Sequence, residues 1–445
     1  MNTPIADFVR RYAASGTARL HMPGHKGRAF LGCEPFDITE IAGADSLYEA
    51  DGVIAQSEAL ASSLFGSART LFSTEGSSQC IRAMLYLCLQ AGKPGTKPVI
   101  VAARNVHKSF VFACALLDFE IVWLWPEEIS SLCACNVSPE ALEKALSSLD
   151  APPAAVYITS PDYLGGMADI AALASVCHAH GTVLAVDNAH GAYLRFLSPS
   201  QHPLDLGADI CCDSAHKTLP VLTGGAYLHI SHSAPASFAA QARQAMALFG
   251  STSPSYLTLT SLDLCNAYLA DGYAQRLAET VQRIHALEHR LAEKGWRVLR
   301  GDPLKLTLDA CAAGTTGIAL AQQLRGHGIE CEFADPETLV LMLTPENTED
   351  DMARLEAALG KNTAKSRPWP ALPSAKGAQS LSVRDAIFAP HETIPAQEAL
   401  GRICGAPTVA CPPAIPIAVS GEVITEEAIA LLQHYGMDEV DVVKG

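Results

Sequence analysis

The chain has 445 residues, of which 49% are hydrophobic, and its formal net charge is −16. This length exceeds what one compact core usually holds, so two or three domains are expected. The acidic balance argues against a nucleic-acid partner, which would need a basic surface. No apolar run approaches the roughly 20 residues of a membrane span, and the first residues lack a signal-peptide pattern. We therefore expect a soluble, cytoplasmic protein with no membrane partner.

The cysteines indicate free thiols rather than a metal site or a disulfide scaffold. The chain has fourteen cysteines, spread from Cys33 to Cys411, and no C-x-x-C pair occurs. A chain of this size does not need disulfides to stabilise its core. We therefore expect buried, reduced thiols and no bound metal.

The first elements form an arm, followed by alternating strands and helices. Residues 1–65 hold several Gly and Pro residues and few strand signals, which predicts an N-terminal arm with short helices. Over residues 66–256, short β-branched runs alternate with helical stretches. The predicted strands are 98–102, 120–124, 155–159, 182–187, 208–212 and 225–230, and the predicted helices include 77–90, 139–149 and 170–180. This alternation is typical of an α/β fold with a mostly parallel sheet.

Smaller parts are predicted downstream. Residues 257–361 begin with a long helical stretch, 257–293, and continue as a small α+β domain. Within that domain, Thr348 precedes three acidic residues and is a good helix N-cap. Residues 362–381 are polar and contain proline, which indicates a linker, and residues 382–445 are predicted to form a C-terminal domain.

Polar residues at the ends of the predicted strands are the candidate site, because ligands of parallel sheets bind beyond the carboxyl ends of the strands. Gly76, Ser77 and Ser78 precede an apolar helix, an arrangement that suits a phosphate but is also a common N-cap. His107 follows a strand and would stack on an aromatic ligand or titrate, unless it is only packed in a loop. Asp187 ends an apolar strand and would pair with a pyridinium nitrogen, unless it caps a turn.

Lys217 follows the next predicted strand, in the segment Ser214-Ala-His216-Lys217-Thr-Leu-Pro. A lysine there is unlikely to be a solvated charge, and a desolvated amine can form a Schiff base. Together, the order of these four segments matches the parts of a pyridoxal-5′-phosphate (PLP) site: phosphate cradle, ring stack, ring-nitrogen partner and Schiff-base lysine. The combination is more specific than any member alone.

Six segments along nearly the whole chain resemble the Orn/Lys/Arg decarboxylase family of fold-type-I PLP enzymes, in its short form. They are His21-Met-Pro-Gly-His25-Lys26-Gly27, Phe36-Asp-Ile-Thr-Glu40 with Asp45-Ser-Leu47, Ser160-Pro-Asp-Tyr-Leu-Gly165, Ser214-Ala-His-Lys-Thr-Leu-Pro220, Ser251-Thr-Ser-Pro-Ser-Tyr256 and Pro412-Pro-Ala-Ile-Pro416 with Gly421-Glu422. The resemblance implies an aspartate-aminotransferase-like fold with PLP as cofactor. It also implies that the chain decarboxylates an amino acid, with arginine, lysine or ornithine as the expected substrate. The expected context is polyamine metabolism.

The resemblance also assigns roles to residues. Gly76, Ser77, Ser78 and Ser214 would hold the phosphate or flank the lysine, His107 would stack on the ring, and Asp187 would pair with its nitrogen. Ala189 and His190 would line the underside of the ring, and Lys217 or His216 would return a proton to the α-carbon. Thr252 would reach the site of a partner subunit, so the smallest competent unit would be a homodimer with shared sites, or a higher oligomer.

The chain also departs from the family pattern. Asn188 replaces the Glu of D-E-A-H, Gln79-Cys80 follows Gly-Ser-Ser, Ala414 replaces the Gly of P-P-G, and Val419-Ser420 replace an apolar residue and Pro. These changes leave two alternatives open: another fold-type-I reaction, such as transamination or elimination, and a non-catalytic paralogue that keeps the fold. Glu422 and Glu392 are candidates for binding a distal cation of the substrate.

Overall fold

The computed structural model describes residues 1–90, 97–126, 130–409 and 413–445. Contacts between residues divide the chain into two compact units. The first comprises Met1–Pro94, Leu149–Ser160 and Asp169–Leu277, and the second comprises Gly95–Ser148, Pro161–Ala168 and Ala278–Gly445. The five predicted domain segments are not the same as these units and stay predictions.

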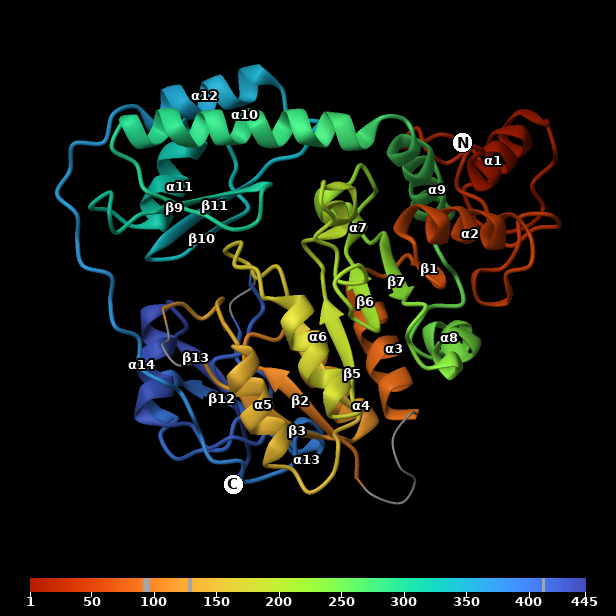
Figure 1. Ribbon diagram of the computed structural model, residues 1–445. Coiled ribbons are helices and arrows are strands. Elements are labelled where there is room, and N and C mark those ends of the chain that lie inside the picture. The colour runs from red at the N-terminus through yellow and green to blue at the C-terminus, as the bar shows by residue number, and fades with distance from the viewer. Residues whose placement is uncertain (91–96, 127–129, 410–412) are drawn as a thin grey trace. The chain divides into compact units, whose positions relative to one another are not determined.

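Seven strands form a mostly parallel sheet in the order β1-β7-β6-β5-β4-β2-β3 (Figure 1). Their bounds are β1 (Arg69–Ser73), β2 (Val99–Ala103), β3 (Glu120–Leu124), β4 (Ala155–Thr159), β5 (Val183–Asp187), β6 (Ile210–Asp213) and β7 (Ala226–Ile230). β2 pairs with β3, β4 with β5, and β5 with β6 in parallel, whereas β7 is antiparallel to β6 and β1. All residues of β6 and β7 are buried, as expected for strands covered on both faces. The predicted α/β class is confirmed.

Two helices of the first unit, α1 (Pro4–Ala14) and α2 (Val53–Phe65), lie in the predicted N-terminal arm. The same unit also contains α3 (Ser77–Gln90), α6 (Ile170–Ala179), α7 (Ala215–Thr218), α8 (Ala236–Leu248) and α9 (Tyr256–Ala270). Asp263 of α9 accepts hydrogen bonds from the backbone N–H of Ala6 at 2.9 Å and from the hydroxyl of Ser57 at 2.6 Å. One buried carboxylate therefore links α1, α2 and α9.

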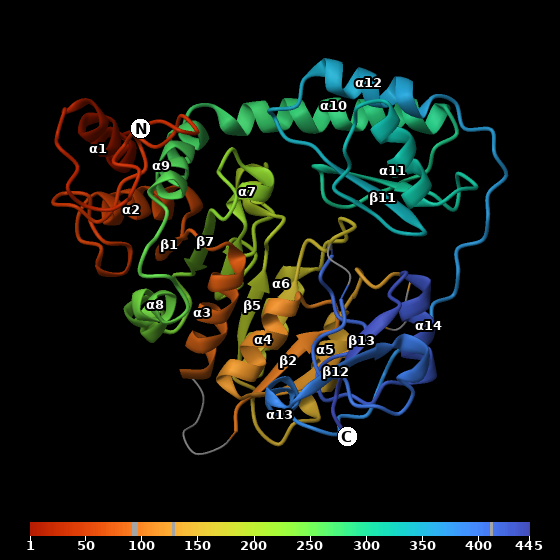
Figure 2. The same ribbon diagram turned by 180° about the vertical axis from the view of Figure 1, so that it is seen from behind.

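The second unit contains a smaller antiparallel sheet with helices on one side. The sheet has the order β10-β11-β9-β8, with bounds β8 (Val298–Leu299), β9 (Lys305–Asp309), β10 (Phe333–Ala334) and β11 (Thr338–Met342). Helices α10 (Tyr273–Glu293), α11 (Gly317–Gly326) and α12 (Glu349–Leu359) lie on the same side of this sheet in both views (Figures 1 and 2). Thr348 caps α12 in a full capping box with Asp351, which confirms the predicted helix start.

The same unit holds α4, α5 and a C-terminal part with its own apolar cluster. The bounds are α4 (Lys108–Leu117), α5 (Pro139–Ser147), α13 (Val383–Phe388), β12 (His391–Pro395), α14 (Glu426–His434) and β13 (Glu439–Val443). β12 and β13 pair antiparallel. Residues from Ala396 to Val442, including Leu431 and Leu432 of α14, form the apolar cluster beside them. Within the described ranges, no helix is both long and apolar enough to cross a membrane.

The thirteen described cysteines are free, and ten of them are buried. Burial raises the pKa of the Cys114 and Cys177 thiols to about 12. The prediction of buried free thiols is therefore confirmed for the described part of the chain, and Cys411 lies outside it.

Candidate active site

The ends of strands β5 and β6 bring several candidate residues to one edge of the sheet. β5 ends at Asp187 and β6 ends at Asp213, and the two strands pair in parallel with Asp187 opposite Cys212. The chain after Asp213 turns at once into the short helix α7, which carries Lys217. Because parallel strands end at the same edge, Asp187 and the lysine turn follow neighbouring strand ends.

The amine of Lys217 lies against an imidazole. Its Nζ is 2.9 Å from Nε2 of His190, a buried residue in the segment after β5. The neighbouring His216 points elsewhere, because its Nδ1 lies 3.0 Å from the carbonyl oxygen of Gly225. A carbonyl can only accept, so Nδ1 of His216 carries the hydrogen. His190 is therefore the histidine whose contact with Lys217 can exchange a proton.

Asp187 is a buried carboxylate, and the thiol of Cys212 lies 3.7 Å from its Oδ1. Oδ2 accepts a hydrogen bond from the hydroxyl of Tyr157 at 3.0 Å, and Oδ1 accepts one from the backbone N–H of Ala189 at 3.2 Å. Burial raises the pKa of Asp187, while the charge of Lys217 opposes that rise. A bound cation beside this carboxyl would favour its ionised form. Tyr157 is a neighbour of Asp187 that sequence reasoning missed.

The start of helix α3 meets the start of the lysine turn. The hydroxyl of Ser214 donates to the hydroxyl of Ser77, the first residue of α3, at 2.8 Å. Gly76, just before the helix, has a φ of 72°, and a Cβ there would meet no atom within 4 Å. Ser78 follows Ser77 in the same helical turn. A helix N-terminus with two hydroxyls and open space beside it is suited to an anion.

His107 belongs to the second unit, where it caps a helix. It is the N-cap of α4, and its Nδ1 accepts a hydrogen bond from the backbone N–H of Ser109 at 3.1 Å. A histidine in this role is fixed in orientation at its Nδ1 edge. Stacking of its ring on a cofactor stays a prediction.

The loop with Thr252 is exposed, and in this single chain it touches its own subunit. Ser251, Thr252 and Ser253 are all exposed, and the backbone N–H of Ser251 donates to the carboxylate of Glu75. Ser255 then caps helix α9. The predicted contact of Thr252 with a partner subunit is not addressed by one chain and stays a prediction.

Sequence reasoning also missed a buried hydrogen-bond network around Asp213. Oδ2 of Asp213 accepts from Nε2 of His202 at 3.1 Å and from Nε2 of His229 at 3.2 Å. Oδ1 accepts from the side-chain amide of Asn188 at 2.7 Å. These four side chains are fully buried. They come from four separate segments, so no spacing in the sequence reveals them.

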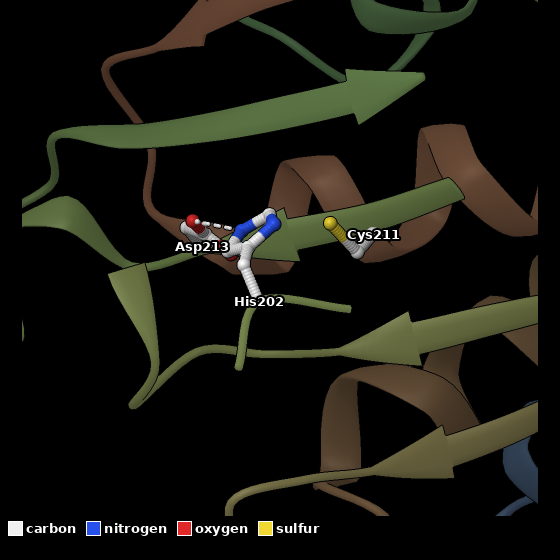
Figure 3. Close-up of side chains that lie close together, drawn as sticks. All are labelled: His202, Cys211 and Asp213. Carbon is white, nitrogen blue, oxygen red and sulfur yellow. Dashed lines mark hydrogen bonds and ion pairs between the residues drawn. The ribbon is translucent and has the colours of Figure 1, made fainter. Parts of the chain in front are cut away.

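His202, Cys211 and Asp213 lie close enough together to raise the question of a metal ion (Figure 3). Metal ligation needs a thiolate and a free imidazole lone pair. Burial raises the pKa of Cys211 well above its usual range, so the thiol keeps its proton. His202 faces Asp213 through Nε2 and accepts the backbone N–H of Leu204 at Nδ1, at 3.4 Å. This cluster is better explained as a hydrogen-bond network.

The two acidic candidates for binding a substrate cation are already paired. Glu422 is buried and lies 3.3 Å from Arg104, and it also accepts the backbone N–H of Val419 at 2.8 Å. Glu392 lies 2.6 Å from Arg402. Both carboxylates therefore pair with arginines of their own chain, and binding of a substrate cation by either stays a prediction.

Comparison with known proteins identifies the family. Residues 3–300 match the model of the Orn/Lys/Arg decarboxylase major domain. The chain belongs to this family. It is 32% identical to an uncharacterised protein, YaaO, of Bacillus subtilis (strain 168), covering 98% of this chain and 94% of that protein. It is 29% identical to an arginine decarboxylase of the same strain, covering 97% and 93%.

Solved structures agree with the fold of this family. The lysine decarboxylase LdcF of Francisella novicida superposes with a TM-score of 0.80 at 17% identity, covering 99% of this chain and 81% of that chain. The predicted family, the aspartate-aminotransferase-like fold and the assignment as an amino-acid decarboxylase are confirmed. The residue roles stay predictions.

The structure shows the surroundings of two departures of this decarboxylase from the family pattern, and it explains the first of them. Gln79 is buried in α3, where its amide nitrogen donates to the hydroxyl of Tyr48 and to the carbonyl of Met246, both at 2.8 Å. It anchors the start of α3. Ala414 has a φ of 60°, a left-handed conformation that favours the glycine of the family motif. Its carbonyl accepts the backbone N–H of Lys108, the residue after His107, at 2.9 Å.

Proposed function

We propose that this chain is a PLP-dependent decarboxylase of a basic amino acid, in which Lys217 binds the cofactor covalently. The observation that carries the proposal is the pairing of the Lys217 amine with His190, beside the buried carboxylate of Asp187. Arginine, lysine and ornithine are the substrates proposed, because the relatives of nearly equal length include arginine decarboxylases. A place in polyamine metabolism and a cytoplasmic location are predictions of the resemblance.

The donor groups of the first unit suit PLP. Asp187 is a buried acid with a raised pKa, which a protonated ring nitrogen would complement. The hydroxyls of Ser77 and Ser214, together with the open space at Gly76, suit a phosphate. The amine of Lys217 is next to an imidazole that can take its proton.

Bound PLP would supply an electron sink for the electrons left when the bond between Cα and the carboxylate breaks. Asp187 would hold the proton of the ring nitrogen and so keep the ring electron-poor. His190 would accept a proton from Nζ of Lys217, which makes the amine a nucleophile, and would return it later. Lys217 would then deliver a proton to the α-carbon and release an amine.

Exposed apolar side chains of the arm support the proposal of a homodimer. Leu20, Phe30 and Leu31 are 95%, 80% and 90% exposed in this single chain. Large apolar residues exposed so fully and so close in sequence are typical of an interface. The loop with Thr252, also exposed, would complete the site of the second subunit.

Incubation of the holoenzyme with a panel of amino acids, followed by detection of amine and CO₂, tests the proposal. One of arginine, lysine or ornithine should give equal amounts of amine and CO₂, and Lys217→Ala should give neither. A keto acid or an elimination product in place of the amine would establish one of the other fold-type-I reactions. No product and no visible absorption band from PLP would support the non-catalytic alternative.

A further inference from the structure

Asp213 is the acceptor at the centre of the buried network, and its donors fix its ionisation. His202 accepts the N–H of Leu204 at Nδ1, and Nδ1 of His229 lies 2.8 Å from the hydroxyl of Thr70. Both rings therefore have Nε2 directed at Asp213, where each Nε2–H donates to the carboxylate. Burial alone would raise the pKa of Asp213, but the two imidazoles lower it well below its usual range. The carboxylate is therefore an anion that needs donors.

Asn188 supplies the third hydrogen-bond donor to Asp213, and its own backbone also makes hydrogen bonds. Its side-chain amide donates to Asp213 at 2.7 Å, and its backbone N–H donates to the carbonyl of Cys212 at 3.0 Å. Its carbonyl accepts the backbone N–H of Gly191 at 2.8 Å. A Cβ on Gly191 would lie 2.0 Å from Oδ1 of Asn188, so the glycine leaves room for this side chain.

The position of this contact in the chain gives it a consequence for the proposed site. Asn188 directly follows Asp187, and Asp213 directly precedes the Ser214–Lys217 turn. The two hydrogen bonds of Asn188 therefore join the strand end that carries the acid to the strand end that carries the lysine. Beyond the backbone pairing of β5 and β6, the contact between Asn188 and Asp213 is a side-chain link between these two strand ends.

We propose that Asn188 is a positioning residue, which acts through Asp213 to fix the spacing between Asp187 and Lys217. The proposal rests on the proposed function, in which these two residues act on one cofactor. The family pattern has a glutamate at this position, and a carboxyl group facing ionised Asp213 would have to keep its proton. An amide donates at every pH, so the spacing in this chain does not depend on the protonation of residue 188.

The other titratable groups around Asp213 do not offer a rival explanation. Cys80, Cys211 and Cys212 interact with its charge, as does Tyr227 of β7. Burial raises the pKa of all four groups, so they stay neutral and are no source of charge. His202 and His229 are the donors already described.

Four variants test the proposal. Asn188→Ala removes the donor, and Asn188→Asp replaces it with a carboxylate of the same shape. The double variant Asn188→Asp with Asp213→Asn restores one carboxylate and one amide in exchanged positions. Asn266→Ala is the matched control, because Asn266 is a buried asparagine of the same unit whose amide donates to the carbonyl of Ser57 at 3.0 Å.

The first measurement uses the apoprotein and so does not depend on the proposed reaction. The pH dependence of acylation of Lys217, followed by peptide mass spectrometry at low conversion, gives the titration midpoint of its amine. Asn188→Ala and Asn188→Asp should shift this midpoint, because Asp187 moves relative to Lys217, and the double variant should bring it back. Asn266→Ala should leave the titration midpoint of Lys217 unchanged, even if this substitution lowers the unfolding temperature. An unchanged midpoint in both Asn188 variants would overturn the proposal.

The second measurement is steady-state kinetics of the holoenzyme. Asn188→Ala should lower kcat roughly 10- to 100-fold with little change in KM, as expected when reacting groups are misplaced. A wild-type chain that forms no amine, together with a shifted Lys217 midpoint, would refute the proposed function and leave the positioning role standing. Normal kcat in stable Asn188 variants would refute the positioning role alone.

Discussion

Lys217 is the residue on which the proposed chemistry depends most directly, and its surroundings explain why it is suited to that role. It lies on a four-residue helix that follows a buried strand, and its amine contacts the buried His190. The imidazole is within reach to exchange a proton with the amine, which a lysine needs before it can act as a nucleophile.

Reduction of the holoenzyme with borohydride should fix the cofactor to the peptide that contains Lys217. Lys217→Ala should lose both the covalent adduct and turnover while keeping the unfolding profile of the apoprotein. Lys26 and Lys108 are the competing lysines, since each adjoins a histidine in the sequence. Peptide mass spectrometry distinguishes the three, and label on either competitor would overturn the assignment.

Asp187 should contribute to rate more than to cofactor affinity. Asp187→Ala removes the charge that would keep the ring nitrogen protonated, and the loss in transition-state stabilisation should be about 3 kcal/mol, seen in kcat/KM. Much of the affinity should remain, because the phosphate contacts are separate. Tyr157→Phe is the matched control, since it removes a hydrogen bond to Asp187 while the carboxylate stays in place. Near-normal turnover with weak cofactor retention would show that Asp187 is only an anchor.

At the scale of elements, the loop after β4 is held to the smaller sheet by buried polar groups. Oδ1 of Asp162 accepts the backbone N–H groups of Leu164 and Gly166 at 2.9 and 2.7 Å. Nζ of Lys305, on β9, donates to the carbonyl of Asp162 at 2.6 Å, and the hydroxyl of Thr307 donates to that of Leu164 at 2.8 Å. The loop therefore packs as part of the second unit.

Ionisation of Asp162 in this loop should lower the free energy of unfolding as the pH rises from about 4 to about 6. Burial raises the pKa of Asp162 to about 6, against the opposing hydrogen bonds and the charge of Lys305. Because the pKa of Asp162 is higher in the folded state than in the unfolded state, protonation of Asp162 stabilises the fold. This contribution to the free energy of unfolding is complete below the unfolded-state pKa and is lost as the pH rises through about 6. The loss is at most about 3 kcal/mol.

Asp162→Asn should remove this pH dependence, because the amide oxygen keeps both backbone hydrogen bonds without a charge. Thermal unfolding midpoints at pH 4.5 and 7.5 measure the effect. Asp169→Asn is the control, since Asp169 is an exposed residue that also accepts a backbone N–H, from Ala172. An equal pH response in wild type and Asp162→Asn would contradict the argument.

Some elements follow from local sequence, and others do not. The strands 120–124 and 155–159 were predicted with the bounds observed, because each is a short run rich in β-branched and aromatic residues. The stretch 257–293 was predicted as one helix, but it divides into α9 and α10 at Asp271-Gly272, where Gly272 has a φ of 68°. β1 was missed, because Arg69–Ser73 has only two strongly apolar residues.

The same limit applies to the candidate site. Lys217 and Asp187 could be proposed as site residues because each lies at or shortly after the end of an apolar strand, which is a local signal. The network of Asp213 was not found, because His202 and His229 meet it only after the sheet has formed. Likewise, the helix-capping role of His107 depends on backbone geometry rather than on residue type.

At the scale of the whole molecule, the exposed loop 251–253 should serve the partner subunit. Mixing Lys217→Ala protein with a protein in which Thr252 and Ser253 are both changed to Ala should restore activity. After random exchange, half of the dimers are hybrids with one intact site each, so about a quarter of wild-type activity is expected. Native mass spectrometry confirms subunit exchange. No recovery, from two parents that are each inactive, would mean that the loop serves its own subunit, where Ser251 already contacts Glu75.

The buried cysteines can report when each unit of this protein opens, because their thiols become accessible to reagents only then. Only a thiolate reacts quickly with an alkylating reagent, and burial both shields these thiols and raises their pKa, so they should be inert in the closed state. Cys88 and Cys177 lie in the first unit, and Cys114 and Cys404 lie in the second. Pulse alkylation followed by peptide mapping would therefore time the opening of each unit separately in the unmodified protein, with half-buried Cys33 as a fast internal standard.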